Sequence, residues 1–423
     1  MEAWTIIGLM CLIWVSIEFV KQLGHSIPVI ELMLFIAGMQ WILGPTIEYY
    51  APGLHYKYYM YVPQEEYSSF VVPAYIFFSL VLILVVRPYS KLKLPVESLG
   101  NYEKYGIIIF IIGIVFDVLA NRLPGSLGFF AFILSNFKYA GAIVLYFSDK
   151  QSLRRVFYFA IVYLFFIAIS RALFHDFILW SLFFYMFWAI KYKPSKKLII
   201  TTILIAAFSL TTLQTIKAAY RAEIWNGYSG NKLELFAGLM VDAILLNGSN
   251  AAELDGDENN VRLNQGWIIS AILDEVPRNQ EFVEGETVME AVSASLLPRF
   301  LNPNKKEAGG RENFMKFTGL QIGEGTSMGI SIIGESYANF NVIGGIIFMG
   351  IWGFFLARIW ILLLKKSIRL PLLLAFIPLI FLQVVKAETE LVVVLNHLVK
   401  SSIVVFGFFW GARKFLKWDL ERE

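Results

Sequence analysis

The chain has 423 residues, of which 57% are hydrophobic and 16% are charged, and its formal net charge is +3. A soluble domain of this size carries charge on about a quarter of its residues. Apolar runs of roughly 20 residues, the length of helix that crosses about 30 Å of hydrocarbon, recur along the whole chain. The composition excludes an ordinary soluble enzyme and predicts an all-α, polytopic integral membrane protein.

We expect about eleven transmembrane helices. In chain order they cover 4–22, 27–50, 69–87, 105–121, 127–147, 155–172, 174–190, 197–216, 330–357, 370–385 and 391–412. The chain then divides into three parts: residues 1–216 with eight helices, a large polar loop at 217–328, and residues 329–423 with three helices and a short tail. The single cysteine, Cys11, lies in the first apolar run and excludes an internal disulfide.

The basic residues predict how the chain is oriented. They gather in alternate short loops, near residues 21, 87–104, 150–155, 191–197, 358–369 and 413–422. Short cytoplasmic loops collect Lys and Arg, so the N-terminus is expected outside, the C-terminus in the cytoplasm and the large loop outside. This asymmetry explains the net positive charge better than nucleic-acid binding does, and we expect no nucleic acid as a partner.

The large loop carries its own helical signals. Apolar residues fall at helical spacing within 233–244, 267–272 and 288–296, separated by polar and turn-forming pieces. We expect short amphipathic helices there, lying on the outer membrane surface or dipping toward it.

Four basic residues at span ends and in the loop are candidates for an anion site. Arg171 ends the sixth predicted helix, Lys217 and Arg221 share one face at the end of the eighth, and Arg299 lies in the loop after Pro298. Guanidinium groups suit bidentate contact with phosphate, and the same cations would stabilise a diphosphate leaving group. The simpler alternatives are snorkelling anchors or contacts to lipid phosphates.

Two more residues could join this site. Lys138 lies in the middle of the fifth predicted helix and is either a further member or a structural ion-pair partner of Asp117. His175 follows Arg171 by four residues and is a further candidate for the outer site.

Acidic and polar candidates follow the loop. Glu335 is a candidate general base or ligand of a sugar hydroxyl, although a carboxylate near a helix N-terminus is also favoured by the helix dipole. Tyr337 and Asn339 would supply hydrogen bonds to a glycan. Weaker candidates for the base are Glu324, Asp274 and Glu275.

No metal or cofactor is expected. Asp255-Gly256-Asp257 looks like a metal-binding pair, but the glycine and glutamate that a calcium loop requires are missing. The chain also has no phosphate-binding P-loop and no dinucleotide fingerprint.

Several short motifs together resemble a known family. They are Ile169-Ser170-Arg171, Leu297-Pro298-Arg299-Phe300, Gly334-Glu335-Ser336-Tyr337-Ala338-Asn339-Phe340 and Val342-Ile343-Gly344-Gly345. With the large late external loop, they resemble the bacterial O-antigen or exopolysaccharide repeat-unit polymerases and, more distantly, the O-antigen ligases. The family often has Asn-Phe-Gly where this chain has Asn339-Phe340-Asn341. The loop histidine of the ligases is absent, which favours a polymerase.

The resemblance implies a metal-independent glycosyltransferase in the bacterial cytoplasmic (inner) membrane. Its donor would be a glycan on a polyprenyl diphosphate and its acceptor a single repeat unit on a second such lipid. Arg171, Arg221 and Arg299 match the positions expected to hold the diphosphate. A flippase and a chain-length regulator of the same pathway would be further partners.

Two alternatives stay open at this point. One is an O-antigen ligase or a similar transferase that moves a glycan to another acceptor. The other is a transporter of lipid-linked oligosaccharide, a class that usually shows repeated halves with interrupted helices. We see no internal repeat in the chain.

Overall fold

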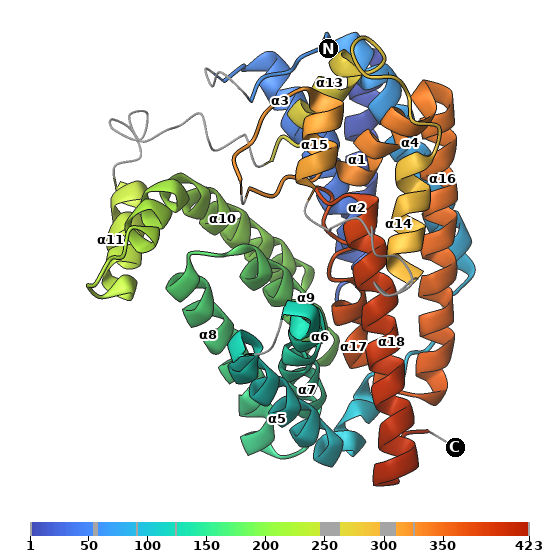
Figure 1. The fold of residues 1–423 in the computed structure, drawn as a ribbon. Helices are drawn as coiled ribbons and strands as arrows, with labels where there is room; N and C mark the ends of the chain where they lie inside the picture. Colours follow the sequence, from blue (N-terminus) through green and yellow to red (C-terminus); the bar gives the residue numbers. More distant parts are fainter. Residues whose placement is uncertain are drawn as a thin grey trace.

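The computed structural model describes residues 2–53, 58–89, 92–122, 125–245, 263–296, 310–324 and 326–421. Every regular element in these ranges is helical, which confirms the all-α prediction (Figure 1). The α-helices, in chain order, are α1 (Ala3–Gln22), α2 (Val29–Gly38), α3 (Gly44–Tyr50), α4 (Gln64–Val86), α5 (Glu103–Leu119), α6 (Gly125–Ser135), α7 (Phe137–Tyr146), α8 (Gln151–Arg171), α9 (His175–Tyr192), α10 (Lys196–Trp225), α11 (Lys232–Leu245), α13 (Gly266–Glu275), α14 (Glu286–Leu296), α15 (Arg311–Thr318), α16 (Ser331–Arg369), α17 (Leu373–Phe381) and α18 (Leu391–Leu416).

Short irregular helices complete the chain. A π-helical segment, Met39–Leu43, joins α2 to α3 without a break. Three 3₁₀ segments lie at Arg87–Tyr89, Glu97–Tyr102 and Ala120–Arg122.

In the described part of the chain, eight helical segments are long and apolar enough to cross a membrane. They are α1, α2 with α3, α4, α6 with α7, α8, α10, α16 and α18, so the protein is a multi-pass membrane protein. The nine residues of α17 span only about 14 Å, and all of them are buried. Its apolar sequence is therefore explained by burial in the core of the protein. Transmembrane helices beyond the eight segments, up to the expected number of about eleven, stay a prediction.

Two predicted spans have a different local structure. The span at 127–147 is divided into α6 and α7 at Asn136, whose Nδ2 donates to the carbonyl of Phe132 over 2.7 Å. The span at 197–216 continues to Trp225, because α10 has 30 residues. Lys217 and Arg221 consequently lie inside the last turns of α10 and not in a loop.

The long helix α16 is interrupted at Asn341. Its backbone there has φ 61° and ψ −170°, so 331–340 and 342–369 are two helices that meet at a kink. The side-chain oxygen of Asn341 accepts a hydrogen bond from the Val342 N–H over 2.6 Å, which caps the second helix.

The helices form a main bundle with a smaller group beside it. The main core runs through α1, α2, α4, α7, α9, α13 and α16–α18. A separate apolar cluster joins α8, the start of α9, α10 and α11. Figure 1 shows α10 and α11 at one side of the molecule, away from α16 and α18.

Three predicted loop helices are present as α11, α13 and α14, and the structure adds α15. The expectation that they lie on the membrane surface does not fit α13, whose residues 266–273 are all buried. Ile269 and Leu273 extend its apolar stripe around the helix, so α13 packs against α3, α15 and α16 as part of the bundle.

Candidate functional site

The C-terminal turn of α8 is held by side chains from α10 and α11. The last carbonyls of a helix have no partner within the helix and must be satisfied from outside. Within 125–245, four successive carbonyls receive such bonds: Tyr220 Oη to Ile169 (2.9 Å), Lys232 Nζ to Ser170 (3.1 Å), Trp225 Nε1 to Arg171 (3.4 Å) and Arg221 Nε to Ala172 (3.0 Å). This capping fixes the end of α10 against the end of α8.

The capping also brings together the two helix ends that carry three of the predicted cations. Arg221 binds the residue directly after Arg171, and its guanidinium lies over the Trp225 ring at 5.2 Å from the centroid. Lys217 is one turn earlier on the same face of α10 and is buried, with 7% of its surface exposed. The ends of α8 and α10 thus lie together, and a common anion site formed by their cations stays a prediction.

The first turn of α9 and the connection between α17 and α18 extend this group. His175 Nδ1 lies 3.6 Å from Glu388 Oε1, and Lys386 Nζ lies 3.6 Å from Asp176 Oδ1. Lys217 also interacts electrostatically with His175. We call Arg171, Lys217, Arg221 and Lys386 the cation cluster, which His175 borders.

Lys138, the other buried lysine predicted for the anion site, is paired with Asp117. Its Nζ is 3.2 Å from Asp117 Oδ1 and donates to the carbonyl of Ser135 over 3.0 Å. Its side chain is 5% exposed. Of the two interpretations offered by the sequence, this geometry supports the structural ion pair with Asp117.

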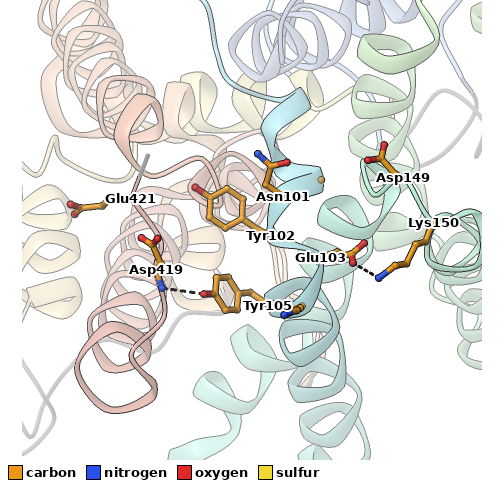
Figure 2. Close-up of a pocket in the computed structure, with 10 residues that line it drawn as sticks. Asn101, Tyr102, Glu103, Tyr105, Asp149, Lys150, Asp419 and Glu421 are labelled. Atoms are coloured by element: carbon orange, nitrogen blue, oxygen red, sulfur yellow. Dashed lines mark hydrogen bonds and ion pairs between the residues drawn. The ribbon is translucent and has the colours of Figure 1, made fainter. Parts of the chain in front are cut away.

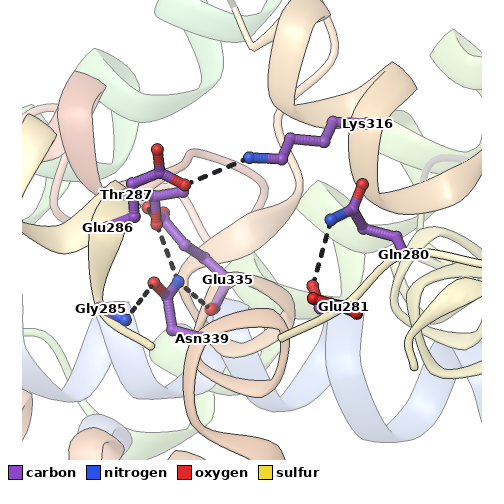
Figure 3. Close-up of polar contacts among 8 residues, drawn as sticks. All are labelled: Gln280, Glu281, Gly285, Glu286, Thr287, Lys316, Glu335 and Asn339. Carbon is purple, nitrogen blue, oxygen red and sulfur yellow. Dashed lines mark hydrogen bonds and ion pairs between the residues drawn. The ribbon is translucent and has the colours of Figure 1, made fainter. Parts of the chain in front are cut away.

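Glu335 lies in a second group of buried polar side chains (Figure 3). Its Oε1 accepts a hydrogen bond from Thr287 Oγ1 over 2.7 Å, and its Oε2 accepts one from the backbone N–H of Leu391 over 2.8 Å. Asn339 donates to Thr287 Oγ1 (2.8 Å) and accepts from the N–H of Gly285 (3.0 Å). Glu335 therefore ties α14 and the N-terminus of α18 to α16, a position that the helix dipole favours for a carboxylate.

A second carboxylate, Glu390, lies beside this group and was not found from the sequence. It is the residue before α18, is 1% exposed and accepts from Asn313 Nδ2 over 2.8 Å. An acidic residue directly before an apolar run is a weak capping signal, and Asn313 is 77 residues away. We call Glu335, Glu390, Thr287, Asn313 and Asn339 the carboxylate cluster.

Tyr337 faces the interior in this structure. Its hydroxyl donates to the carbonyl of Val276 over 3.2 Å, and its ring packs against Phe70 and Phe282. Its side chain, like those of Glu335 and Asn339, is almost fully buried. Contact between these residues and a glycan stays a prediction.

The connection between α17 and α18 touches both clusters. Lys386 and Glu388 contact the first turn of α9. Glu390 belongs to the carboxylate cluster, and the N–H of the next residue, Leu391, donates to Glu335. Five peptide units separate Lys386 from Leu391, which limits the distance between these Cα atoms to roughly 18 Å.

Two candidates lie outside the described residues: Arg299, and the Asp255-Gly256-Asp257 sequence. Among the weaker bases, Glu275 accepts from Asn279 over 2.9 Å and Asp274 pairs with Arg278 over 2.6 Å at the surface. Glu324 is exposed. In the described ranges, no group of three or more His, Cys, Asp or Glu side chains is arranged to hold a metal ion.

No family model matches this chain, and neither a curated protein nor a solved structure matches it.

Proposed function

We propose that the protein polymerises polyprenyl-diphosphate-linked oligosaccharide repeat units into O-antigen or exopolysaccharide chains at the outer face of the bacterial cytoplasmic membrane. The observation that carries this proposal is the α17–α18 connection, which joins a cation cluster to a buried carboxylate cluster. A glycosyl transfer from a diphosphate donor requires both: cations for the leaving group and a base for the attacking hydroxyl.

In the proposed reaction, a hydroxyl of the acceptor sugar attacks the anomeric carbon of the donor glycan. The bond between that carbon and the diphosphate oxygen breaks, and the polyprenyl diphosphate leaves with the electron pair. Arg171, Arg221 and Arg299 hold the diphosphate, with Lys217 beside them, and stabilise the charge that develops on it. No metal is required, because the cations supply the electrostatic stabilisation.

Glu335 is the proposed acceptor of the hydroxyl proton. Thr287 and the Leu391 N–H fix the orientation of its two oxygens, and Asn339 holds Thr287 in turn. A positioned carboxylate of this kind contributes rate by general-base catalysis. Tyr337 and Asn339 are proposed to support the acceptor side of the site.

A transporter of lipid-linked oligosaccharide is the second candidate. The observation that favours it is the break between α6 and α7 next to the buried Lys138–Asp117 pair, since transporters use interrupted helices and buried charges. An O-antigen ligase would use the same cations but deliver the glycan to a different acceptor.

The length of glycan on polyprenyl and on the cell surface separates the three functions. We would compare wild type with Arg171→Ala and Arg299→Ala at equal membrane abundance. Lys193→Ala, an exposed lysine at the opposite end of α9, is the matched control.

A polymerase predicts that both arginine variants leave single repeat units while Lys193→Ala makes long chains. Long chains that persist on the carrier lipid and fail to reach their final acceptor would establish the ligase. Repeat units that accumulate on the cytoplasmic side would establish the transporter.

A further inference from the structure

A basic pocket lies between the C-terminal ends of α16 and α18, far along both helices from the two clusters. Its volume is about 860 Å³. Its described lining has five basic side chains, one acidic side chain and several apolar ones: Lys365, Lys366, Arg369, Arg413, Lys414, Glu421, Leu370, Phe406, Phe409 and Trp410. Glu421 pairs with Arg413, so the charge of the pocket stays strongly positive.

Aromatic rings form the α18 side of the pocket. Lys366 of α16 lies over the Phe406 ring at 5.4 Å from the centroid, and Lys414 lies over Trp410 at 4.9 Å. The Lys366–Phe406 contact joins the two helices across the pocket. These contacts place the ammonium groups next to apolar surface, where an amphiphilic ligand would meet both.

Exposed apolar residues on the outward faces of both helices lead toward this pocket. On α16, Phe355 and Leu362 are 40% and 49% exposed and precede Lys365 and Arg369 on the same face. On α18, Ile403 is 62% exposed and precedes Trp410, which is 59% exposed. Each helix therefore changes from apolar to basic along one face, as a lipid changes from acyl chain to headgroup.

A neighbouring pocket has the opposite character (Figure 2). It has a volume of about 590 Å³, and its lining has four acidic side chains and two basic ones: Glu103, Asp149, Asp419, Glu421, Lys104 and Lys150. Lys150 is paired with Glu103 there. Of these two pockets, the one between α16 and α18 therefore has the excess of positive charge.

We propose that the α16–α18 pocket binds the phosphodiester headgroup of an anionic membrane phospholipid, with its acyl chains along the exposed apolar faces of the two helices. Basic pockets between transmembrane helices attract such headgroups. A soluble phosphate would use the cations but leave the apolar faces and Trp410 without a role, and this favours a lipid as the occupant.

Binding of defined lipids to the purified full-length chain, measured by native mass spectrometry, tests the proposal. The probes are cardiolipin, phosphatidylglycerol and phosphatidylcholine, with inorganic phosphate as a soluble competitor. The test variant combines Lys365→Gln, Lys366→Gln and Arg369→Gln. The matched control combines Lys193→Gln, Lys196→Gln and Lys197→Gln, which removes the same charge from exposed lysines where α9 ends and α10 begins.

We expect cardiolipin and phosphatidylglycerol to bind wild type and control alike, and the pocket variant at least about tenfold more weakly. Phosphatidylcholine should not bind. A variant with Lys365→Arg and Lys366→Arg should keep the affinity for cardiolipin and phosphatidylglycerol. This result would show that binding depends on the positive charge and that substitution at these positions leaves the fold intact.

Three results would overturn the proposal. Equal weakening of the pocket variant and the control would show general electrostatic attraction, and no weakening in either would show that the lipid binds elsewhere. Displacement of the lipid by inorganic phosphate at equal concentration would show a soluble phosphate site. The function proposed above does not depend on any of these outcomes, because the pocket shares no residue with either cluster.

Discussion

Glu335 is the residue on which the chemical part of the proposal depends. It is 2% exposed and accepts hydrogen bonds from Thr287 and from the Leu391 N–H. Glu335→Gln keeps the shape of the side chain but removes the proton acceptor. We expect chain elongation to fall at least about 100-fold in an assay at matched protein level, as for loss of a general base.

Thr287→Val is the control that disturbs the position of Glu335 without removing the proton acceptor. It removes the hydrogen bonds of Thr287 with Glu335 and Asn339 and keeps the carboxylate. We expect it to lower stability by about 1–3 kcal/mol and to keep elongation within about tenfold of wild type. If Glu335→Gln elongates as well as Thr287→Val, Glu335 is an anchor of α14 and α18 and not the base.

Asn341 has a backbone conformation that suits glycine. Its φ of 61° with ψ −170° lies in a region that is essentially restricted to glycine and costs about 1–3 kcal/mol for other residues. We expect Asn341→Gly to raise the unfolding temperature of the detergent-solubilised protein. Asn341→Ala keeps the strain and loses the cap on Val342, so it should lower that temperature; the reverse order would contradict the kink.

At the scale of single residues, the sequence predicts which side chains are candidates for a site better than it predicts what they contact. Arg171, Lys217, Arg221 and His175 were predicted to lie together because span ends and helical spacing are local signals. Glu390 and its partner Asn313 were missed, since their contact joins residues 77 positions apart and exists only in the folded chain. The Lys138–Asp117 pair was one of two interpretations, and only the folded distance selects it.

At the scale of helices, α5 and α7 pack closely through glycine. A Cβ added at Gly113 would lie 1.9 Å from the backbone nitrogen of Lys138, so α7 would have to move. We expect Gly113→Ala to lower the free energy of unfolding by about 1–3 kcal/mol.

Gly407→Ala in α18 is the matched control, because nothing lies within 4 Å of its added Cβ. Alanine has the higher helix propensity, so this variant should be neutral or up to about 1 kcal/mol more stable. Thermal unfolding of both variants in one detergent checks the contrast, and equal effects would contradict the close α5–α7 contact.

The positions of the helices along the chain were mostly predicted correctly, whereas their burial and their contacts with other helices were predicted less well. Length and apolarity identified the eight segments that could cross a membrane, because these signals are local. The burial of α13 was not predicted, because its apolar stripe within 267–272 indicates an amphipathic helix. Ile269 and Leu273 lie outside that stripe and make the helix apolar on all sides. The extension of α10 to Trp225 was missed because its last turns are polar, and tertiary capping of α8 stabilises them.

For the molecule as a whole, the orientation in the membrane is a prediction from the basic loops. Cys11→Ser gives a cysteine-free chain, into which Met289→Cys (α14, 69% exposed) or Lys193→Cys is added. A membrane-impermeant maleimide applied to right-side-out vesicles should label Met289→Cys at once. Lys193→Cys should be labelled only after permeabilisation, and the opposite pattern would reverse the proposed sidedness.

The most direct test of the central claim is reconstitution of the purified protein in proteoliposomes with a polyprenyl-diphosphate-linked repeat unit, without nucleotide sugar or added metal. Product length is read by electrophoresis or mass spectrometry. The proposed function predicts lipid-linked oligomers for wild type and for Lys193→Ala, and single units for Arg171→Ala and Arg299→Ala. Wild type that leaves the single units unchanged, in the presence of a repeat unit from its own host, would contradict the polymerase.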